Sequence, residues 1–271
     1  MLILIIGSAP DALEAQNLKK ELFGAIVAIN NAWNIRNDWD FCIFPDDFPE
    51  NRRPTKNKDK RLINSKQYVP IQNKYGGFVY SGGTMSFTAG YWALGYFKPK
   101  AIAYIGCDMI YDGKVTHFYG RGKPDPLRKD PTLKNLKAKS ARLEAIATSQ
   151  GCAIFNLSKG PSSNLVFRRS SLENITKDSS PRGINTKLLK RALQWEEKLG
   201  YFVENGKYWK HLAKFDQEKI DVLDELWNNI IESVYSVYSR YAYLTTGRQA
   251  GGEVGLDPQT IHRPNLTRAG L

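Results

Sequence analysis

The chain is poor in the residues that build disulfide frameworks and metal centres. Its 271 residues include three cysteines and three histidines. The cysteines, Cys42, Cys107 and Cys152, are odd in number, match no metal-ligand spacing, and lie in or beside apolar runs. This usage disfavours a disulfide scaffold or a zinc site and predicts buried, reduced thiols in a cytoplasmic protein.

Long hydrophobic runs are also missing, since a membrane span needs about 18 apolar residues or more. The apolar stretch near the start covers only residues 2–6, has no basic segment before it, and is interrupted by Gly7. This pattern predicts a first β-strand rather than a signal peptide. We therefore expect no transmembrane segment, a cytoplasmic location, and attachment to a membrane surface as an open alternative.

Positive charge is in excess. The formal net charge is +12, which favours anionic partners such as nucleotides, nucleic acid, acidic glycans or anionic lipid. The basic residues gather in two clusters, within residues 52–61 and 123–142. A solvated, highly charged surface is an equally good interpretation of these clusters.

Strand-like and helix-like segments alternate through the first 157 residues. Apolar runs predict strands at residues 2–6, 25–29, 41–44, 78–80, 101–105 and 152–157. Helical spacing predicts helices at residues 11–22, 85–96 and 133–150, and residues 46–66 are expected to form a long loop. The alternation predicts an α/β fold with a Rossmann-like, mainly parallel sheet flanked by helices.

The pattern changes after residue 160, so we predict three regions. These are a Rossmann-like nucleotide-sugar-binding domain over residues 1–160, a linker or lid with a helical region over 161–246, and a flexible tail over 247–271. Residues 217–244 form the strongest helical pattern, with an apolar stripe at spacings of three and four. Such a stripe indicates core packing or an oligomer interface, so a homo-oligomer through these helices is left open.

Turns with glycine, amide or hydroxyl groups follow three of the predicted strands: Gly7-Ser8, Asn30-Asn31 and Ser81-Gly82-Gly83. In an open α/β sheet, ligands bind beyond the carboxyl ends of the strands. Free N–H groups at the start of a helix suit a phosphate, and the asparagine amides suit a base or ribose. Ser81, Thr84 and Ser86 are predicted either to cap a helix or to bind a sugar. The sequence therefore predicts one ligand over three turns, although ordinary turns have the same composition.

The loop after residues 101–105 contains the groups that chemistry at a phosphate needs: Asp108, Tyr111, Asp112, His117, Tyr119, Arg121, Lys123 and Arg128. The histidine is the candidate general base or acid. The two tyrosines are candidate donors to a leaving phosphate, and the three basic residues are candidates to neutralise it. A surface loop whose aromatic side chains pack on the sheet is the alternative. His211 and His262 have no evident partners.

Two adjacent acids, Asp46 and Asp47, follow the third predicted strand. Sugar transferases that depend on a metal use an acid pair to hold a divalent cation on a diphosphate. The pair here is adjacent rather than alternate, which favours a turn with solvated carboxylates.

The ordered set Gly7-Ser8-Ala9-Pro10, Asn30-Asn31, Ser81-Gly82-Gly83 and Gly106-Cys107-Asp108 resembles the compact bacterial sialyltransferases of glycosyltransferase family 42. It is also similar to the related domain-of-unknown-function 115 group. The similarity spans about residues 1–165. It implies a Rossmann-like sheet, a CMP-sialic acid donor, no metal, and a small lid near the acceptor.

Carried over to this sequence, the resemblance implies nucleotide contacts from Ser8, Asn30 or Asn31, Ser81, Gly82 and Asp108. The family's catalytic histidine precedes the next helix, where residues 130–137 hold no histidine and Lys134 is the nearest match. In the family, two tyrosines in the loop after the aspartate hold the leaving phosphate. Tyr111 lies close to the position of the first, and the second falls at Thr116-His117, where this sequence has no tyrosine. His117 is therefore a substitute for the family's base rather than its counterpart.

The main hypothesis is an enzyme: a metal-independent glycosyltransferase without a cofactor, which moves a sialic-acid-like sugar from a CMP-linked donor to a hydroxyl acceptor. The acceptor is a glycan, lipid-linked or free, or nucleic acid. One alternative is an Mg-dependent, pyrophosphokinase-like phosphotransferase with Asp46, Asp47, Asp108 and Asp112 as metal ligands. The other is a non-catalytic binding or assembly protein that keeps the nucleotide fold.

Overall fold

A computed structural model of the chain describes residues 1–55, 61–111, 115–122 and 129–231. The chain divides into two compact units, Met1–Glu232 and Ser233–Leu271. The second unit lies outside the described residues, and so do Asp112, Lys123, Arg128 and His262.

The described residues contain a seven-stranded sheet in the order β4-β3-β2-β1-β5-β6-β7, and each pair of neighbouring strands is parallel. The strands are β1 Leu2–Ile6, β2 Ala25–Ile29, β3 Phe41–Ile43, β4 Arg61–Ile63, β5 Ala101–Ile105, β6 Ala153–Asn156 and β7 Arg168–Arg169. The predicted α/β fold with a Rossmann-like parallel sheet is therefore confirmed.

The central strands are apolar because they are covered on both faces, as the strands of parallel sheets usually are. In β1, Ile3 and Ile5 contribute to one hydrophobic cluster, whereas Leu4 and Ile6 contribute to the other. Ile3 pairs with β2 on one side and with β5 on the other. The alternation of side chains along β1 thus supplies the centre of two core layers.

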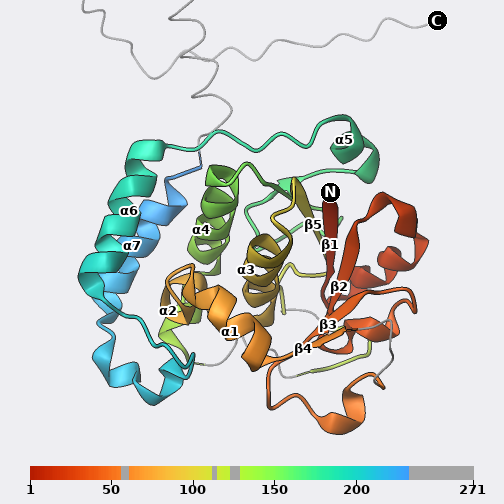
Figure 1. Cartoon of the computed structure of the whole chain (residues 1–271), viewed down its shortest axis with the longest axis horizontal. Helices are drawn as coiled ribbons and strands as arrows, with labels where there is room; N and C mark the ends of the chain where they lie inside the picture. Colours follow the sequence, from red (N-terminus) through yellow and green to blue (C-terminus); the bar gives the residue numbers. More distant parts are fainter. Residues whose placement is uncertain (56–60, 112–114, 123–128, 232–271) are drawn as a thin grey trace, which may run out of the picture. The chain divides into compact units, whose positions relative to one another are not determined.

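Helices cover the sheet, and Figure 1 shows their arrangement. The α-helices are α1 Ser65–Asn73, α2 Phe78–Ser81, α3 Met85–Phe97, α4 Leu136–Ser149, α5 Leu172–Lys177, α6 Thr186–Leu199 and α7 Gln217–Asn228. The 3₁₀ turns are η1 Pro10–Asn17, η2 Lys20–Leu22, η3 Asn30–Asn34, η4 Glu50–Arg52, η6 Pro131–Leu133, η7 Tyr208–Lys210 and η8 Leu212–Lys214. No described helix combines the length and the hydropathy that crossing a bilayer would take.

The α-helix predicted over residues 11–22 is wrong, because η1 and η2 are 3₁₀ segments. Leu13 and Leu22, expected on its buried face, are exposed, whereas Ala12 and Ala15 are buried. A Cβ on Gly106 would lie 2.4 Å from the Cβ of Ala12. This close approach to the sheet leaves room only for small side chains.

The strand predicted at residues 78–80 is also wrong, since these residues begin the short helix α2. Tyr80 Oη donates to Glu196 O at 2.7 Å and accepts from Tyr201 N at 2.8 Å. Contacts with a distant part of the chain therefore override the local pattern.

Two segments that were predicted to lack regular structure contain short elements. The loop predicted over residues 46–66 contains β4 and η4, and residues 160–183, predicted to be a linker or lid, contain β7 and α5.

The C-terminal helices α6 and α7 pack on α4, on the side away from α3 (Figure 1). Their apolar contact joins Leu223 and Trp227 of α7 to Ala138 and Ala145 of α4. The predicted continuous helix over residues 217–244 is wrong, because α7 ends at Asn228 and Ile231 forms a β-bridge with Ile184. Within the described residues, these helices are part of the same compact unit as the sheet.

Candidate functional site

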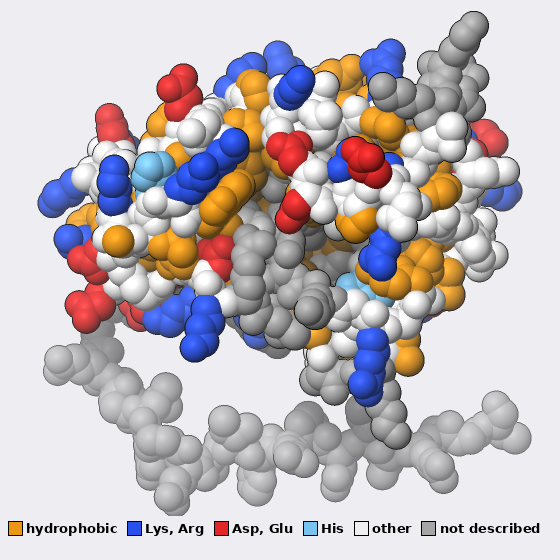
Figure 2. Space-filling view, turned by 90° about the horizontal axis from the view of Figure 1, so that it is seen from below, with side chains coloured by type: hydrophobic (Ala, Val, Ile, Leu, Met, Phe, Trp, Pro, Cys, Tyr) orange, Lys and Arg blue, Asp and Glu red, His pale blue; other side chains and the backbone are white. Residues whose placement is uncertain are grey.

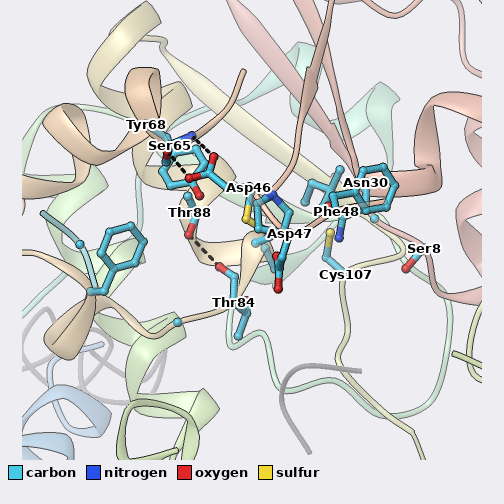
Figure 3. A pocket seen from close by; sticks show the side chains of 18 of the residues that line it. Ser8, Asn30, Asp46, Asp47, Phe48, Ser65, Tyr68, Thr84, Thr88 and Cys107 are labelled. Atoms are coloured by element: carbon cyan, nitrogen blue, oxygen red, sulfur yellow. Dashed lines mark hydrogen bonds between the residues drawn. The ribbon is translucent and has the colours of Figure 1, made fainter. Parts of the chain in front are cut away.

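A cavity of about 1050 Å³, called the crevice below, lies beyond the carboxyl ends of the central strands. The strand order reverses between β1 and β5, which is where open α/β sheets bind ligands. The crevice is lined by the turns after β1, β2, β3 and β5, by α1 and the start of α3, and by residues 205–209. Figure 3 shows part of this lining. Seven predicted site residues line it: Gly7, Ser8, Asn30, Gly83, Tyr111, His117 and Tyr119.

The turn after β1 has fewer free N–H groups than the sequence predicted for a phosphate site. Gly7 N donates to Ile105 O at 2.8 Å, and Ala9 N donates to Gly106 O at 3.0 Å. A Cβ on Gly7 would lie 2.2 Å from Gly106 O. Gly7 therefore allows the turns after β1 and β5 to touch, and two of the N–H groups that were expected to face a ligand already have acceptors.

The start of α3 is a better anion site. Its N-cap is Thr84, whose Oγ1 accepts from Phe87 N at 3.4 Å. In the described part of the chain, the N–H groups of Met85 and Ser86 have no acceptor. Because α3 is 13 residues long, its dipole adds positive potential at this end. Thr84, Met85 and Ser86 all line the crevice.

Two buried polar atoms of the crevice also lack hydrogen-bond partners within the described residues. They are the Oγ of Ser86, a residue that is 8% exposed, and the Oδ1 of Asn30. Asn30 has a φ of 52°, in the left-handed region that non-glycine residues rarely adopt. A buried polar atom without a partner costs about 1–3 kcal/mol. These atoms are therefore available to a polar ligand.

Cys107 lies beside Ser86, and its burial disfavours the thiolate that a nucleophile needs. Burial raises the pKa of the Cys107 thiol well above its usual range, and the Ser86 hydroxyl opposes this shift only in part. The two side chains form no hydrogen bond of ordinary geometry. The Ser86 hydroxyl, which lines the crevice, is therefore left without a protein partner in the described residues.

His117 is buried and stacks between two tyrosines. Its ring centroid lies 6.0 Å from that of Tyr111 and 5.0 Å from that of Tyr119, with interplanar angles of 28° and 29°. Burial lowers the pKa of His117, which favours the neutral imidazole. Its Nδ1 lies 2.9 Å from Thr116 Oγ1. When Nδ1–H donates to Thr116, the lone pair is on Nε2, as a general base requires.

The chain around His117 is a tight turn that is tied to β1. His117 and Gly120 exchange two backbone hydrogen bonds of 3.0 and 2.9 Å, and Phe118 N donates to Ser8 O at 2.9 Å. A Cβ on Gly122 would lie 2.8 Å from His117 Cε1. Because Gly122 has no side chain, the imidazole of His117 has room to lie against this turn.

Four predicted ligand contacts do not line the crevice. Ser81 is fully buried and accepts from Gln72 Nε2, and a Cβ on Gly82 would meet Phe87 and Lys139. Asp108 is buried and accepts from Asn156 Nδ2 at 2.8 Å, and Asn31 lies within η3. Ser81 and Gly82 do not line the crevice because their turn follows the helix α2 rather than the strand that was predicted there.

The acids do not converge on a metal site. Asp46 and Asp47 line the crevice, and Asp46 points toward Ser65, whose Oγ donates to it at 2.6 Å (Figure 3). Asp108, another predicted metal ligand, does not line the crevice. Within the described residues, no three acids, histidines or cysteines are placed to hold a metal ion. Asp112, the fourth predicted ligand, lies outside that range.

The cations of the crevice differ from the predicted ones. Arg121 does not line it, and Lys123 and Arg128 lie outside the described residues. Lys66 of α1 and Lys207 line it instead. Sequence reasoning missed both, because Lys66 falls in a segment taken for a loop and Lys207 lies far along the chain. No periodic pattern marks either one.

Three comparisons, with models of protein families, with curated proteins and with solved structures, find no match to this chain. The resemblance to the sialyltransferase family therefore stays a prediction.

Proposed function

We propose that the protein is a glycosyltransferase that moves a sugar from a nucleotide-linked donor, first of all a CMP-linked one, to a hydroxyl acceptor. The observation that carries the proposal is that a neutral, buried histidine stacked between two tyrosines faces the same crevice as the start of α3, where N–H groups are free. Sugar transfer from a phosphate leaving group needs both a base and an anion site.

The donor phosphate would bind at the start of α3, held by the N–H groups of Met85 and Ser86 and by the Ser86 hydroxyl. Lys66 and Lys207, which line the same crevice, would offset its charge. The Asn30 amide, with Oδ1 unpaired, would accept from the base or ribose. These groups all favour the departing phosphate, so they assist cleavage of the bond to the sugar.

His117 would act on the acceptor. Its Nε2 takes the proton of the acceptor hydroxyl while that oxygen bonds to the anomeric carbon. The bond between the anomeric carbon and the phosphate oxygen breaks, and the electron pair leaves with the nucleotide. Because burial lowers the pKa of His117, the imidazole stays unprotonated at neutral pH and is ready to accept this proton.

A ligand screen tests the donor class. CMP, UDP, GDP and ATP are added to the protein with and without Mg²⁺, and thermal unfolding is followed. A ligand at 100 times its Kd adds about 2.7 kcal/mol of stability. We expect CMP to stabilise the protein without metal. Stabilisation by ATP only with Mg²⁺ would instead support the phosphotransferase. No stabilisation by any of the four nucleotides would support a non-catalytic protein.

The variant His117→Gln tests the base. Turnover of a CMP-linked sugar should fall by about 10²- to 10⁴-fold, while stabilisation by CMP stays unchanged. His211→Gln is the matched control, since His211 does not line the crevice, and it should leave turnover intact. Because the pKa of His117 is lowered, the acid limb of the wild-type rate should lie below pH 6.5. Equal turnover in both variants would exclude His117 as the base.

A further inference from the structure

A second surface feature lies at the rim of the crevice, between α6 and α7. It comprises Lys207, Trp209, Lys210, Leu212 and Lys214, and is called the 207–214 patch below. Trp209 is 56% exposed and Leu212 is 40% exposed, and the three lysines are exposed as well. Large apolar side chains held in solvent beside lysines are typical of a surface that meets a partner.

The exposure is built into the fold. Tyr208, the neighbour of Trp209, is 2% exposed, stacks on Phe78 with ring centroids 6.2 Å apart, and donates to Asp130 Oδ2 at 2.7 Å. Phe215 packs on Tyr201 with ring centroids 5.4 Å apart. These anchors fix both ends of the segment, so η7 and η8 hold Trp209 and Leu212 away from the core.

The lysines of the patch have no acidic partner within the described residues. The acids at its edge are Glu204, Asp216 and Glu218. Asp216 already pairs with Lys219 and accepts from the backbone N–H groups at the start of α7. The positive charge of the patch is therefore uncompensated by ion pairs.

The patch and the crevice share a rim, because Lys207 and Trp209 line both. Figure 2, which views this side of the molecule, shows hydrophobic side chains next to lysines and arginines on the same face. A surface that bound the patch would therefore lie beside the opening of the crevice.

We propose that the 207–214 patch docks the protein on an anionic phospholipid surface. Trp prefers the boundary between water and lipid, where its ring is apolar and its N–H remains hydrated. Trp209 and Leu212 would enter that boundary, and Lys210 and Lys214 would lie over acidic headgroups. Charge complementarity favours this occupant, since an apolar partner alone would leave the lysines unmatched. The proposal does not depend on the proposed function.

Co-sedimentation of the full chain with vesicles tests the proposal. The vesicles contain phosphatidylcholine alone or phosphatidylcholine with phosphatidylserine. We expect binding only to the phosphatidylserine vesicles, and weaker binding as salt is added. Lys210→Gln with Lys214→Gln should weaken binding about 30-fold, because two charges near the surface are lost. Trp209→Ala with Leu212→Ala should weaken it at least about tenfold.

Matched controls on α6 separate the patch from general charge. Lys187→Gln with Lys190→Gln removes the same charge from exposed positions, and Leu193→Ala truncates a side chain that is 42% exposed. Both controls should bind like the wild type. Absence of wild-type binding would overturn the proposal, as would equal losses in the patch variants and the controls. Circular dichroism of each variant verifies that it is folded.

Discussion

Two regions of this molecule bury polar groups, and they differ in how those groups are satisfied. In the contact of α4 with α6 and α7, buried charges of opposite sign face each other in ion pairs, and the unpaired atoms Trp195 Nε1 and Asp224 Oδ2 do not line the crevice. In the crevice, Ser86 Oγ and Asn30 Oδ1 are buried without a partner in the described residues. Burial of polar groups is thus common to both regions, whereas unmet hydrogen-bonding capacity that faces the crevice distinguishes the second region.

The helix contact is built around Arg142, which is 1% exposed. Its guanidinium makes two hydrogen bonds of 2.7 Å to the Glu196 carboxylate and one of 2.7 Å to Tyr91 Oη. Nearby, Lys139 Nζ lies 2.7 Å from Asp224 Oδ1, whereas Asp224 Oδ2 and Trp195 Nε1 have no partner within the described residues. These pairs hold α6 and α7 in register on α4, since any sliding would leave a charge without its partner.

The largest effect should come from breaking this helix contact. Arg142→Met leaves the buried Glu196 carboxylate without its cation, with only Trp227 Nε1 still donating to it among the described residues, so the free energy of unfolding should fall by about 3–5 kcal/mol. Urea denaturation measures it. The double variant Arg142→Met with Glu196→Met removes both charges and should recover part of the loss. Additive losses in the double variant would contradict this account of the pair.

A pH-dependent effect should follow from Glu144, which is also on α4. Burial raises the pKa of Glu144 from 4.5 to about 7, and Arg182 opposes the shift. Because the folded-state pKa is the higher one, the resulting stabilisation is complete below pH 4.5 and is lost as the pH rises through about 7. Relative to Glu144→Gln, the wild type should lose about 2–3 kcal/mol between pH 5 and pH 8.

Urea denaturation of both proteins across that pH range checks the effect of Glu144. Glu173→Gln is the control, because Glu173 is exposed and pairs only with Lys177. Its stability should follow the wild type at each pH. A wild type whose stability rises between pH 5 and pH 8 relative to Glu144→Gln would refute the prediction.

A substitution at Ser86 in the crevice should lower ligand affinity and leave the stability of the fold unchanged. Ser86→Ala removes an unpaired buried hydroxyl, so stability should be unchanged or slightly raised. Affinity for CMP or inorganic phosphate should fall about 10- to 100-fold, the cost of losing a hydrogen bond to a charged group. Calorimetric titration and urea denaturation measure the two quantities.

Ser140→Ala is the matched control for Ser86→Ala. Ser140 is also fully buried, but its Oγ accepts from Val166 N at 2.9 Å. This variant should lose about 1–3 kcal/mol of stability, because a buried N–H loses its acceptor, and its affinity for CMP should not change. If both serine variants behaved alike, the distinction between the two regions would fail.

The smallest effect should come from Lys134, which pairs with Asp221 at the surface. Lys134→Gln should change the free energy of unfolding by less than about 1 kcal/mol, because solvent screens an exposed pair. Lys134 does not line the crevice, so CMP binding should also stay constant. Urea denaturation and calorimetric titration check both expectations. A large loss of stability would mean that solvent exposure does not limit the contribution of this ion pair to the free energy of unfolding.

The amino-acid sequence by itself determined the centre of the sheet. The runs at residues 2–6, 25–29 and 101–105 form β1, β2 and β5 with the predicted bounds. Strands buried on both faces must be apolar along their length, so a short apolar run between polar turns suffices to find them. Their order along the chain also predicted that Ser8, Asn30 and the loop with His117 would share the edge where those strands end.

Only the tertiary structure decided which polar groups face the crevice. Ser81 and Asp108 are residue types that bind ligands, but Ser81 is hydrogen-bonded to Gln72 on α1, and Asp108 to Asn156, which is 48 residues away in the sequence. Lys66 and Lys207 enter the crevice from α1 and from the segment after α6. Local patterns carry the period of a strand or helix, whereas the pairing of a buried polar group depends on which remote segment packs against it.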